Sequence, residues 1–446
     1  MKRFFGKFKF AYYYIVNSIG FYPTVISLIF ALLAMVMLYL ETLGLSKSLK
    51  DNLPLVIISN GDTARLILSS ITTGIISLTV FSFTMVMLVL NQASSNFSPR
   101  VIPGLISYKS NQRVMGLYLG TLIYTLIIMV NVHSDYYTVP LPGFSIFLAM
   151  CFTILCLGFF VYFIHSISLS IQIESILESI YEVTKRELET EIKEDDKGKA
   201  YPILEANNWI TLNSPRTGYL QSINEEAVVE MCKEYELVLC FMQPLGNFLI
   251  DGIPFAKINK KLENLEEFTS GLFAHLNFYR EERPDINYLF GFKHITESAV
   301  RALSPSLNDP GTAIKAIDYL TDLFILRMQL TDERVICDDQ GNGRILFMQE
   351  TFKQLLTLSL SPIRLYSKES SIVLLRLLYL FRSLLLKAKE HPHLLPVIFK
   401  EVKWLVEDAE EGVTNKADRE RINEQLKELN DLNVMQKNLP LLSTGL

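Results

Sequence analysis

The chain has 446 residues, half of them hydrophobic, and its mean hydropathy is +0.26. It is too apolar for an ordinary soluble protein of this length, and with 20% charged residues it is too polar to lie wholly within a membrane. Residues 1–170 hold ten basic and four acidic side chains, which leaves 32 of the 42 basic and 43 of the 47 acidic residues for 171–446. An acidic second part argues against nucleic acid as a partner, because phosphates require a basic surface.

The cysteines predict neither a disulfide framework nor a metal site. No two of them form a CxxC pair, so we interpret them as small buried hydrophobic residues. They are Cys151, Cys156, Cys232, Cys240 and Cys337.

Four apolar segments are long enough to cross a bilayer, which needs about 20 residues at 1.5 Å each. None contains Asp, Glu, Lys or Arg, and the first is long enough to span the membrane rather than to serve as a cleaved signal peptide. Before it, Lys2, Arg3, Lys7 and Lys9 alternate with aromatic residues, which is typical of a helix lying at the membrane interface. The segments are Phe21–Leu40, Leu66–Leu90, Val114–Val132 and Phe144–Ile167.

The distribution of basic residues predicts the orientation of these spans. Four basic residues precede the first span and three more, Arg100, Lys109 and Arg113, lie in the second connection, whereas the third connection, 131–143, has none. Because basic loops stay on the cytoplasmic side, we expect both termini to be cytoplasmic. The chain is therefore expected to be a multi-pass membrane protein.

The second span carries hydroxyl side chains on one helical face, because Ser70, Thr73, Ser77 and Thr84 are separated by three, four and seven residues. This face could line a water-filled pore in a homo-oligomer. Alternatively, the hydroxyls could allow close packing between helices. Because no charged residue lies within the spans, a coupled transporter is disfavoured, whereas a passive channel is not.

The chain is predicted to be an α+β membrane protein in which four transmembrane helices precede a mainly helical cytoplasmic region with a small β-barrel or sandwich. We expect an interfacial helix and membrane domain at 1–170, a helical stalk at 171–200, a β-rich domain at 201–260, and a mainly helical domain with one β-hairpin at 261–446. Asn224 and Asp309 are expected to cap helices, with Pro310 at a first helical position. The last helix, Lys416–Leu432, has little apolar surface and is expected to fray.

The β-rich segment is similar in pattern to lipoyl and biotinyl domains, which present a modified lysine in a tight hairpin. No such site exists here, because Lys257 lies outside any hairpin turn. We therefore expect no cofactor.

One polar cluster could bind a ligand or a cytoplasmic protein partner. His294, Glu297 and Arg301 share one face of a predicted helix, and Asn308, Asp309 and Pro310 follow in the next corner. The alternative is structural: Glu297–Arg301 is an ordinary i, i+4 pair and Asp309 is a cap. Without a nucleophile motif, phosphate-binding loop, metal-ligand spacing or dinucleotide fingerprint, we expect neither an enzyme nor a metal site.

Two motifs carry a family resemblance. Asn91–Arg100, NQASSNFSPR, and Arg301–Leu320, RALSPSLNDPGTAIKAIDYL, resemble signatures of domain-of-unknown-function family 2254, which comprises predicted bacterial membrane proteins. The resemblance implies an inner-membrane protein and carries no catalytic residue or cofactor. The first motif follows the second span and is a candidate for coupling it to the soluble part, through Asn91, Gln92, Ser94, Ser95, Asn96, Ser98, Pro99 and Arg100.

Two hypotheses follow for function. The first is a homo-oligomeric membrane protein that forms a passive ion or small-solute pathway along the second span, with the cytoplasmic part as an assembly or gating domain. The second is a membrane-anchored binding or scaffolding module without transport activity.

Overall fold

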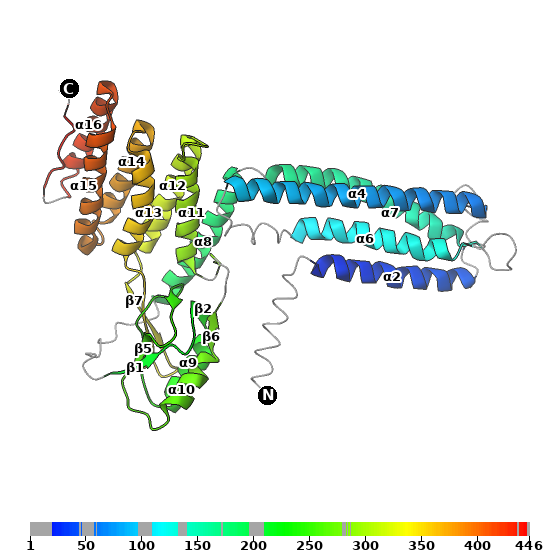
Figure 1. Ribbon diagram of the computed structural model, residues 1–446, viewed down its shortest axis with the longest axis horizontal. Helices are drawn as coiled ribbons and strands as arrows, with labels where there is room; N and C mark the ends of the chain where they lie inside the picture. The colour runs from blue at the N-terminus through cyan, green and yellow to red at the C-terminus, as the bar shows by residue number, and fades with distance from the viewer. Residues whose placement is uncertain are drawn as a thin grey trace. The chain divides into compact units, whose positions relative to one another are not determined.

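The computed structural model describes residues 20–43, 46, 58, 60–96, 109–132, 141–170, 173–195, 209–278, 282, 284–285, 287–434 and 437–443, without the side chains of 90, 92–96, 109–110, 168–170, 173 and 194–195. The predicted interfacial helix before Gly20 lies outside these residues. The chain divides into two compact units, the first holding the elements up to residue 170 and the second those from Ile173 onward (Figure 1).

The first unit contains four long helices, one at each of the four predicted spans. They are α2 (Phe21–Thr42), α4 (Gly61–Asn96), α6 (Lys109–Val130) and α7 (Gly143–Ser170). Each contains a stretch long and apolar enough to cross a bilayer. Helix α4 has 36 residues and is therefore about 54 Å long at 1.5 Å per residue, well beyond a hydrocarbon core of about 30 Å.

Helix α6 approaches α2 closely at two glycines spaced by four residues. A Cβ atom at Gly116 would lie 2.7 Å from Ile26 Cδ1, and one at Gly120 would lie 2.8 Å from Phe30 Cγ. Glycines at this spacing let two membrane helices come into backbone contact, where dispersion forces replace the hydrophobic effect. The pair therefore fixes how α2 and α6 pack.

Two charged residues outside the apolar cores cap helix ends of the first unit. Glu41 is 4% exposed and its Oε1 accepts hydrogen bonds from Ser145 N at 3.0 Å and Ser145 Oγ at 3.1 Å, at the start of α7. Arg65 donates to Val132 O at 3.0 Å, just beyond the end of α6. Glu41 thus satisfies a backbone N–H that α7 leaves unpaired, and Arg65 binds a carbonyl two residues after α6; their charges complement the dipoles of these two helix ends.

The second unit begins with α8 (Ile173–Asp195), the predicted stalk. Its apolar spacing predicts one buried face, and Ile176, Leu177, Ile180, Thr184 and Leu188 are indeed buried. This face packs on α11 and α12. Helix α8 is therefore an integral part of the helical layer.

Helix α8 and helices α11 to α16 of the second unit stand side by side, whereas α9 and α10 lie with the strands (Figure 1). Asp309 caps α12 as predicted, and Thr351 and Gln354 form a reciprocal capping box on α13. The sequence pattern of Gln349–Ser361 predicts a helix that ends before Pro362, but α13 continues through this proline to Ser367. Beyond α8, the layer consists of α11 (Tyr288–Ala302), α12 (Pro310–Arg327), α13 (Phe352–Ser367), α14 (Ser371–Lys387), α15 (Leu395–Gly412), preceded by the 3-10 turn Pro392–Leu394, and α16 (Lys416–Asp431).

The strands form two open sheets, so the predicted β-barrel does not close among the described residues. One sheet has the order β1-β5-β3-β8-β7 and the other β4-β2-β6. All pairs are antiparallel except β3 with β8. The strands are β1 (Ile210–Asn213), β2 (Gly218–Ile223), β3 (Leu239–Phe241), β4 (Phe248–Leu249), β5 (Pro254–Ile258), β6 (Leu276–Phe278), β7 (Glu333–Cys337) and β8 (Gly343–Met348).

Two segments from the helical region complete these sheets. The hairpin β7–β8, expected within that region, joins the larger sheet through β3, where Phe241 and Phe347 stack with ring centroids 4.7 Å apart. The sequence pattern of 259–283 predicts one helix, but the structure has only the short α10 (Leu265–Phe273) there, followed by β6. Helix α9 (Glu225–Glu234) begins at Asn224 as predicted, because the Asn224 side chain accepts from Ala227 N. Both sheets share one apolar core.

The prediction that the last helix frays is wrong. Helix α16 buries Ile422, Leu426 and Leu429, and it also buries the polar side chains of Arg419 and Asn423. These two polar side chains donate hydrogen bonds to the backbone of residues 442–443. The face of α16 that carries them is therefore a contact surface for this later segment and is not open to solvent.

Candidate functional site

A cleft of about 720 Å³ lies in the second unit between α11 and α13. One wall of the cleft is the loop between β3 and β4. Asn287 connects this loop to the start of α11, because its side chain accepts a hydrogen bond from Leu289 N at 3.0 Å and donates one to Leu245 O at 3.1 Å. In this loop Gly246 has φ +96°, and a Cβ there would lie 3.2 Å from Phe290 Cζ. Glycine therefore permits both the turn and its close approach to α11.

The walls of the cleft are mainly apolar. Helix α11 contributes residues that recur every three or four positions, as expected for one helical face, and α13 supplies the facing wall. The apolar lining consists of Leu245, Leu289, Phe290, Val300, Leu355, Leu358, Pro362 and Tyr366. At the mouth, Leu358 is 64% and Tyr366 is 50% exposed, so apolar surface continues out of the cleft.

Thr296 Oγ1 and Glu350 Oε2, which belong to this lining, have no hydrogen-bond partner among the described residues. Thr296 is 6% exposed. Burial also raises the pKa of Glu350, because desolvation disfavours its charged form. An unpaired polar atom in such surroundings is costly, so a bound molecule with hydrogen-bonding groups would be stabilised here.

The predicted polar cluster is divided by the structure. Glu297 and Arg301 line the cleft together with Lys293. His294 does not line it: it is 1% exposed, and its Nε2 lies 3.3 Å from Glu282 Oε2. Glu282 Oε1 also accepts from Lys293 Nζ at 2.7 Å. His294 is therefore held in the interior by a carboxylate partner.

The corner that follows α11 has the geometry of a helix junction. Asp309 accepts from Thr312 N at 3.1 Å and Thr312 Oγ1 at 2.6 Å, and these bonds lower the pKa of its carboxyl group. Asn308 has φ +45°, a left-handed conformation that Asn adopts more readily than most residues. Pro310 occupies the first helical position of α12. These contacts account for the corner structurally; its role as a docking surface stays a prediction.

The hydroxyl residues of α4 are exposed on the first unit. Ser70, Thr73, Ser77 and Thr84 each donate a hydrogen bond to the carbonyl four residues earlier, at 2.8 to 3.0 Å. Gly74 lies among them and nothing lies within 4 Å of where its Cβ would be. This face of α4 therefore does not pack against the other three helices of the unit. Its hydroxyl groups instead donate hydrogen bonds to backbone carbonyls of α4 itself.

The candidate coupling motif is described only in part. Asn91 is an exposed residue of α4. Gln92, Ser94, Ser95 and Asn96 belong to the same helix, but their side chains lie outside the described residues, as do Ser98, Pro99 and Arg100 entirely. The predicted role in coupling is therefore not tested.

Sequence reasoning missed the apolar wall and the inner polar groups of the cleft. The spacing of Leu289, Thr296 and Val300 on α11 was a usable signal, because it repeats with the helical period. No comparable signal pointed to Glu350 or to α13, which lie about 50 residues further along the chain. Within the described part of the chain, no group of three or more His, Cys, Asp or Glu side chains is placed to hold a metal ion.

A family model covers the part of the chain that contains the cleft. A model described as predicted membrane protein (DUF2254) matches residues 16–383. Uncharacterized proteins of Mycobacterium tuberculosis and Mycobacterium bovis are 24% identical over 334 residues, which is 71% of this chain. The chain spans 63% of the length of these relatives. No solved structure gives a significant match.

Proposed function

Because the chain belongs to the DUF2254 family of predicted membrane proteins, we propose that it is a membrane-anchored binding protein. The four-helix unit is the anchor, and the cleft between α11 and α13 holds an amphipathic small molecule. The proposal is for binding without transport. It corresponds to the second of the two hypotheses drawn from the sequence.

The observation that carries the proposal is the pair of buried polar atoms, Thr296 Oγ1 and Glu350 Oε2, in an otherwise apolar cleft. Binding sites for small molecules are typically about 300 to 1,000 Å³, mainly apolar, and contain a few polar groups that fix orientation. The cleft volume of 720 Å³ lies within this range. A ligand with a donor or hydroxyl group at Thr296 and Glu350 and an apolar body along Val300 and Leu358 fits this lining.

The bilayer is the natural source of such a ligand, because lipid-derived amphiphiles concentrate where the anchor holds the protein. The basic residues Lys293 and Arg301 are balanced in the lining by the carboxyl groups of Glu297 and Glu350, and Lys293 is also paired with Glu282 at 2.7 Å. We therefore favour an amphiphile whose small head is uncharged and can donate to Glu350, such as a long-chain fatty acid bound in its protonated form.

We further propose that the anchor lies in a bacterial inner membrane with both termini in the cytoplasm. This orientation is supported by Lys2, Arg3, Lys7 and Lys9 before the first span and by the absence of basic residues from 131–143. Labelling of single cysteines at Ser134 and at Asn415 with a membrane-impermeant maleimide in intact cells tests it, in a chain whose native cysteines are replaced. The outer position should react and the inner position should not.

A photoactivatable fatty acid, a diazirine derivative of palmitic acid, tests the cleft in the purified full chain. Mapped by peptide mass spectrometry, saturable labelling should appear on α11 and α13 and should be competed by unlabelled palmitic acid. Leu358→Trp and Val300→Trp, which fill the cleft, should remove this labelling. Ile372→Trp provides a matched control, because Ile372 is 58% exposed on α14 and does not line the cleft. Labelling confined to the spans would contradict the proposal.

A second candidate function is a passive ion or small-solute pathway in a homo-oligomer. The observation that favours it is the outward-facing stripe of Ser70, Thr73, Gly74, Ser77 and Thr84 on α4, which could meet the same stripe of neighbouring copies around an axis. The purified chain in liposomes should then pass ions, and Ser77→Leu should reduce the flux. A monomeric mass in detergent together with no flux would exclude this function.

A further inference from the structure

A short segment after α16, residues 437–443, folds back along that helix, and we call it the strap. Asn430 and Asn423 of α16 hold it at Leu439 and Leu442, so the strap runs in the opposite direction to the helix. The two asparagines are seven residues apart and lie about 10.5 Å apart along the axis. Three residues of chain span at most about 10 to 11 Å. The strap between Leu439 and Leu442 must therefore be almost fully extended.

Each asparagine binds both peptide groups of one strap residue. Asn423 accepts from Leu442 N at 2.7 Å and donates to Leu442 O at 2.9 Å. Asn430 accepts from Leu439 N at 2.8 Å and donates to Leu439 O at 3.1 Å. The two asparagines therefore recognise the peptide backbone of the strap and not its side chains. An edge strand of a sheet binds an added peptide strand through its backbone in a similar way.

Apolar side chains supply the sequence preference. Leu439 and Leu442 are each 3% exposed, whereas Pro440 and Leu441 between them are exposed. The strap thus follows the pattern Leu-x-x-Leu, with the two leucines buried and the two intervening residues open to solvent.

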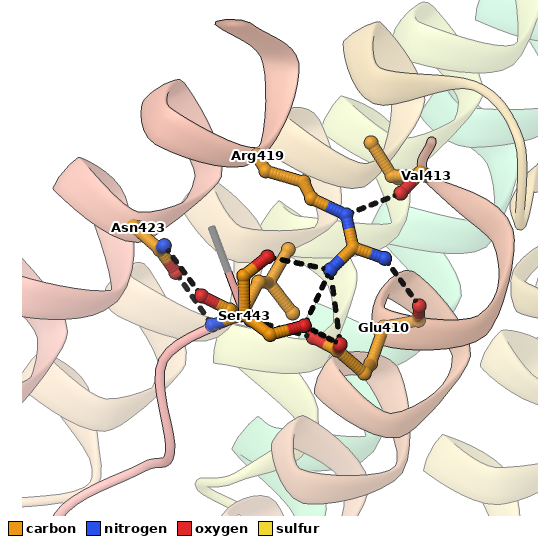
Figure 2. A network of polar contacts seen from close by, with 6 residues as sticks. Glu410, Val413, Arg419, Asn423 and Ser443 are labelled. Atoms are coloured by element: carbon orange, nitrogen blue, oxygen red, sulfur yellow. Dashed lines mark hydrogen bonds and ion pairs between the residues drawn. The ribbon is translucent and has the colours of Figure 1, made fainter. Parts of the chain in front are cut away.

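The strap ends in a charged clamp formed with α15 (Figure 2). Ser443 N donates to Glu410 Oε2 at 3.0 Å, and Ser443 Oγ donates to Glu410 Oε1. Arg419, which is 4% exposed, donates to Ser443 O at 2.8 Å and also to the backbone carbonyls of Glu410 and Val413. The guanidinium therefore connects the strap to the end of α15.

We propose that α16 and the end of α15 form a groove for an extended peptide of the pattern Leu-x-x-Leu-Ser, which residues 439–443 fill in this chain and which the same segment of a second copy can fill in exchange. Without the strap, the amides of Asn423 and Asn430 would lose their backbone partners and the buried Arg419 would lose its bonds to Ser443, so the empty groove is unfavourable. Occupation from the same chain requires the chain to reverse direction between α16 and the strap, and Asn433 at the start of this connection has φ +50°. Exchange with a second copy does not require this reversal.

Peptide binding tests the groove. The probe is a fluorescein-labelled synthetic peptide of residues 437–443, and the protein is the full chain shortened after Gln436, in detergent. We expect saturable one-to-one binding to the shortened chain, and binding at least tenfold weaker to the intact chain, whose own strap competes at a high effective concentration. Asn423→Asp keeps the acceptor but loses the donor, so it should weaken binding at least tenfold. Glu424→Ala, an exposed neighbour, should leave binding unchanged.

If the shortened chain does not fold, the intact chain carrying both Leu439→Asp and Leu442→Asp replaces it, because charged residues in the two buried positions should release the strap. No saturable peptide binding to either folded variant would overturn the groove.

Exchange between copies is tested with two differently tagged intact chains, one carrying Ser443→Cys and the other Glu410→Cys. Mixing should give a disulfide-linked dimer of the two tags, and Glu424→Cys in place of Glu410→Cys should give none. Peptide binding without this dimer would overturn the exchange.

Discussion

The contact between α8 and α11 gives the most quantitative prediction, because α11 carries the cleft and α8 follows the last apolar helix of the first unit. At Gly291, a Cβ atom would lie 1.8 Å from Thr184 Oγ1 and 2.5 Å from Thr184 Cγ2. Ordinary contacts between heavy atoms are about 3.5 to 4.0 Å. Gly291→Ala therefore requires α8 to move by more than 1 Å, and Thr184 cannot easily turn away because it is fully buried and bonded to Ile180 O.

The expected cost follows from two opposing effects. Overpacking of this kind costs about 1 to 3 kcal/mol and sometimes more, whereas alanine is favoured over glycine in a helix by about 1 kcal/mol. Because the added methyl group would meet three atoms of Thr184, we expect Gly291→Ala to lower the free energy of unfolding by about 2 kcal/mol. In a unit of this size, that lowers the midpoint of thermal unfolding by about 4 to 8 °C.

Tryptophan fluorescence measures this change in the second unit alone, because both tryptophans, Trp209 and Trp404, lie there. Thr184→Gly should rescue Gly291→Ala, so the double variant should be more stable than the sum of the two single effects predicts. Gly271→Ala is the control, since its Cβ would meet only the flexible end of Met231 at 3.2 Å. A Gly291→Ala chain as stable as the native one, or strictly additive effects with Thr184→Gly, would refute the close packing of α8 on α11.

Three further predictions concern the cleft, the first unit and the strap. Thr296→Val removes an unsatisfied buried hydroxyl and should raise stability by about 1 kcal/mol while reducing saturable fatty-acid labelling of the cleft; unchanged labelling would contradict the role of this hydroxyl. Gly120→Leu should place a side chain into Phe30 and lower the temperature at which the detergent-solubilised chain aggregates, and Phe30→Ala should restore part of the loss. Hydrogen bonds from Ser443 and Arg419 lower the pKa of the Glu410 carboxyl group below its ordinary value of 4.5. The ionised carboxylate therefore helps to hold the strap above pH 4.5, and this contribution is lost as the pH falls through the lowered pKa. Binding of the strap peptide to the shortened chain should accordingly weaken between pH 6 and pH 3.5, and in Glu410→Gln this pH dependence should largely disappear.

Local signals predicted local structure well. Apolar runs without charge predicted the four long helices, and the Asn224 and Asp309-Pro310 patterns predicted where α9 and α12 begin. These features depend on neighbouring residues, such as a cap three positions from the amide it accepts, and are therefore visible in a single sequence.

Features that depend on distant residues were not predictable in the same way. The parallel pairing of β3 with β8 joins segments about 100 residues apart, and the facing wall of the cleft comes from α13. The expectation that α16 frays was wrong for a related reason: Asn423 and Arg419 are polar residues, but both are buried and bind the backbone of residues 442–443. His294 was grouped with Glu297 by helical spacing, yet Glu282, outside that helix, holds it away from the cleft.

The most direct test of the proposed function is an experimental density map of the full chain purified from its native membrane. The proposal predicts elongated density in the cleft, with a polar end at Thr296 and Glu350 and an apolar body along Val300 and Leu358, and it predicts that this density is lost in Leu358→Trp. A cleft that contains only water in the native chain, or one closed by Leu358 and Tyr366 packing onto α11, would contradict it.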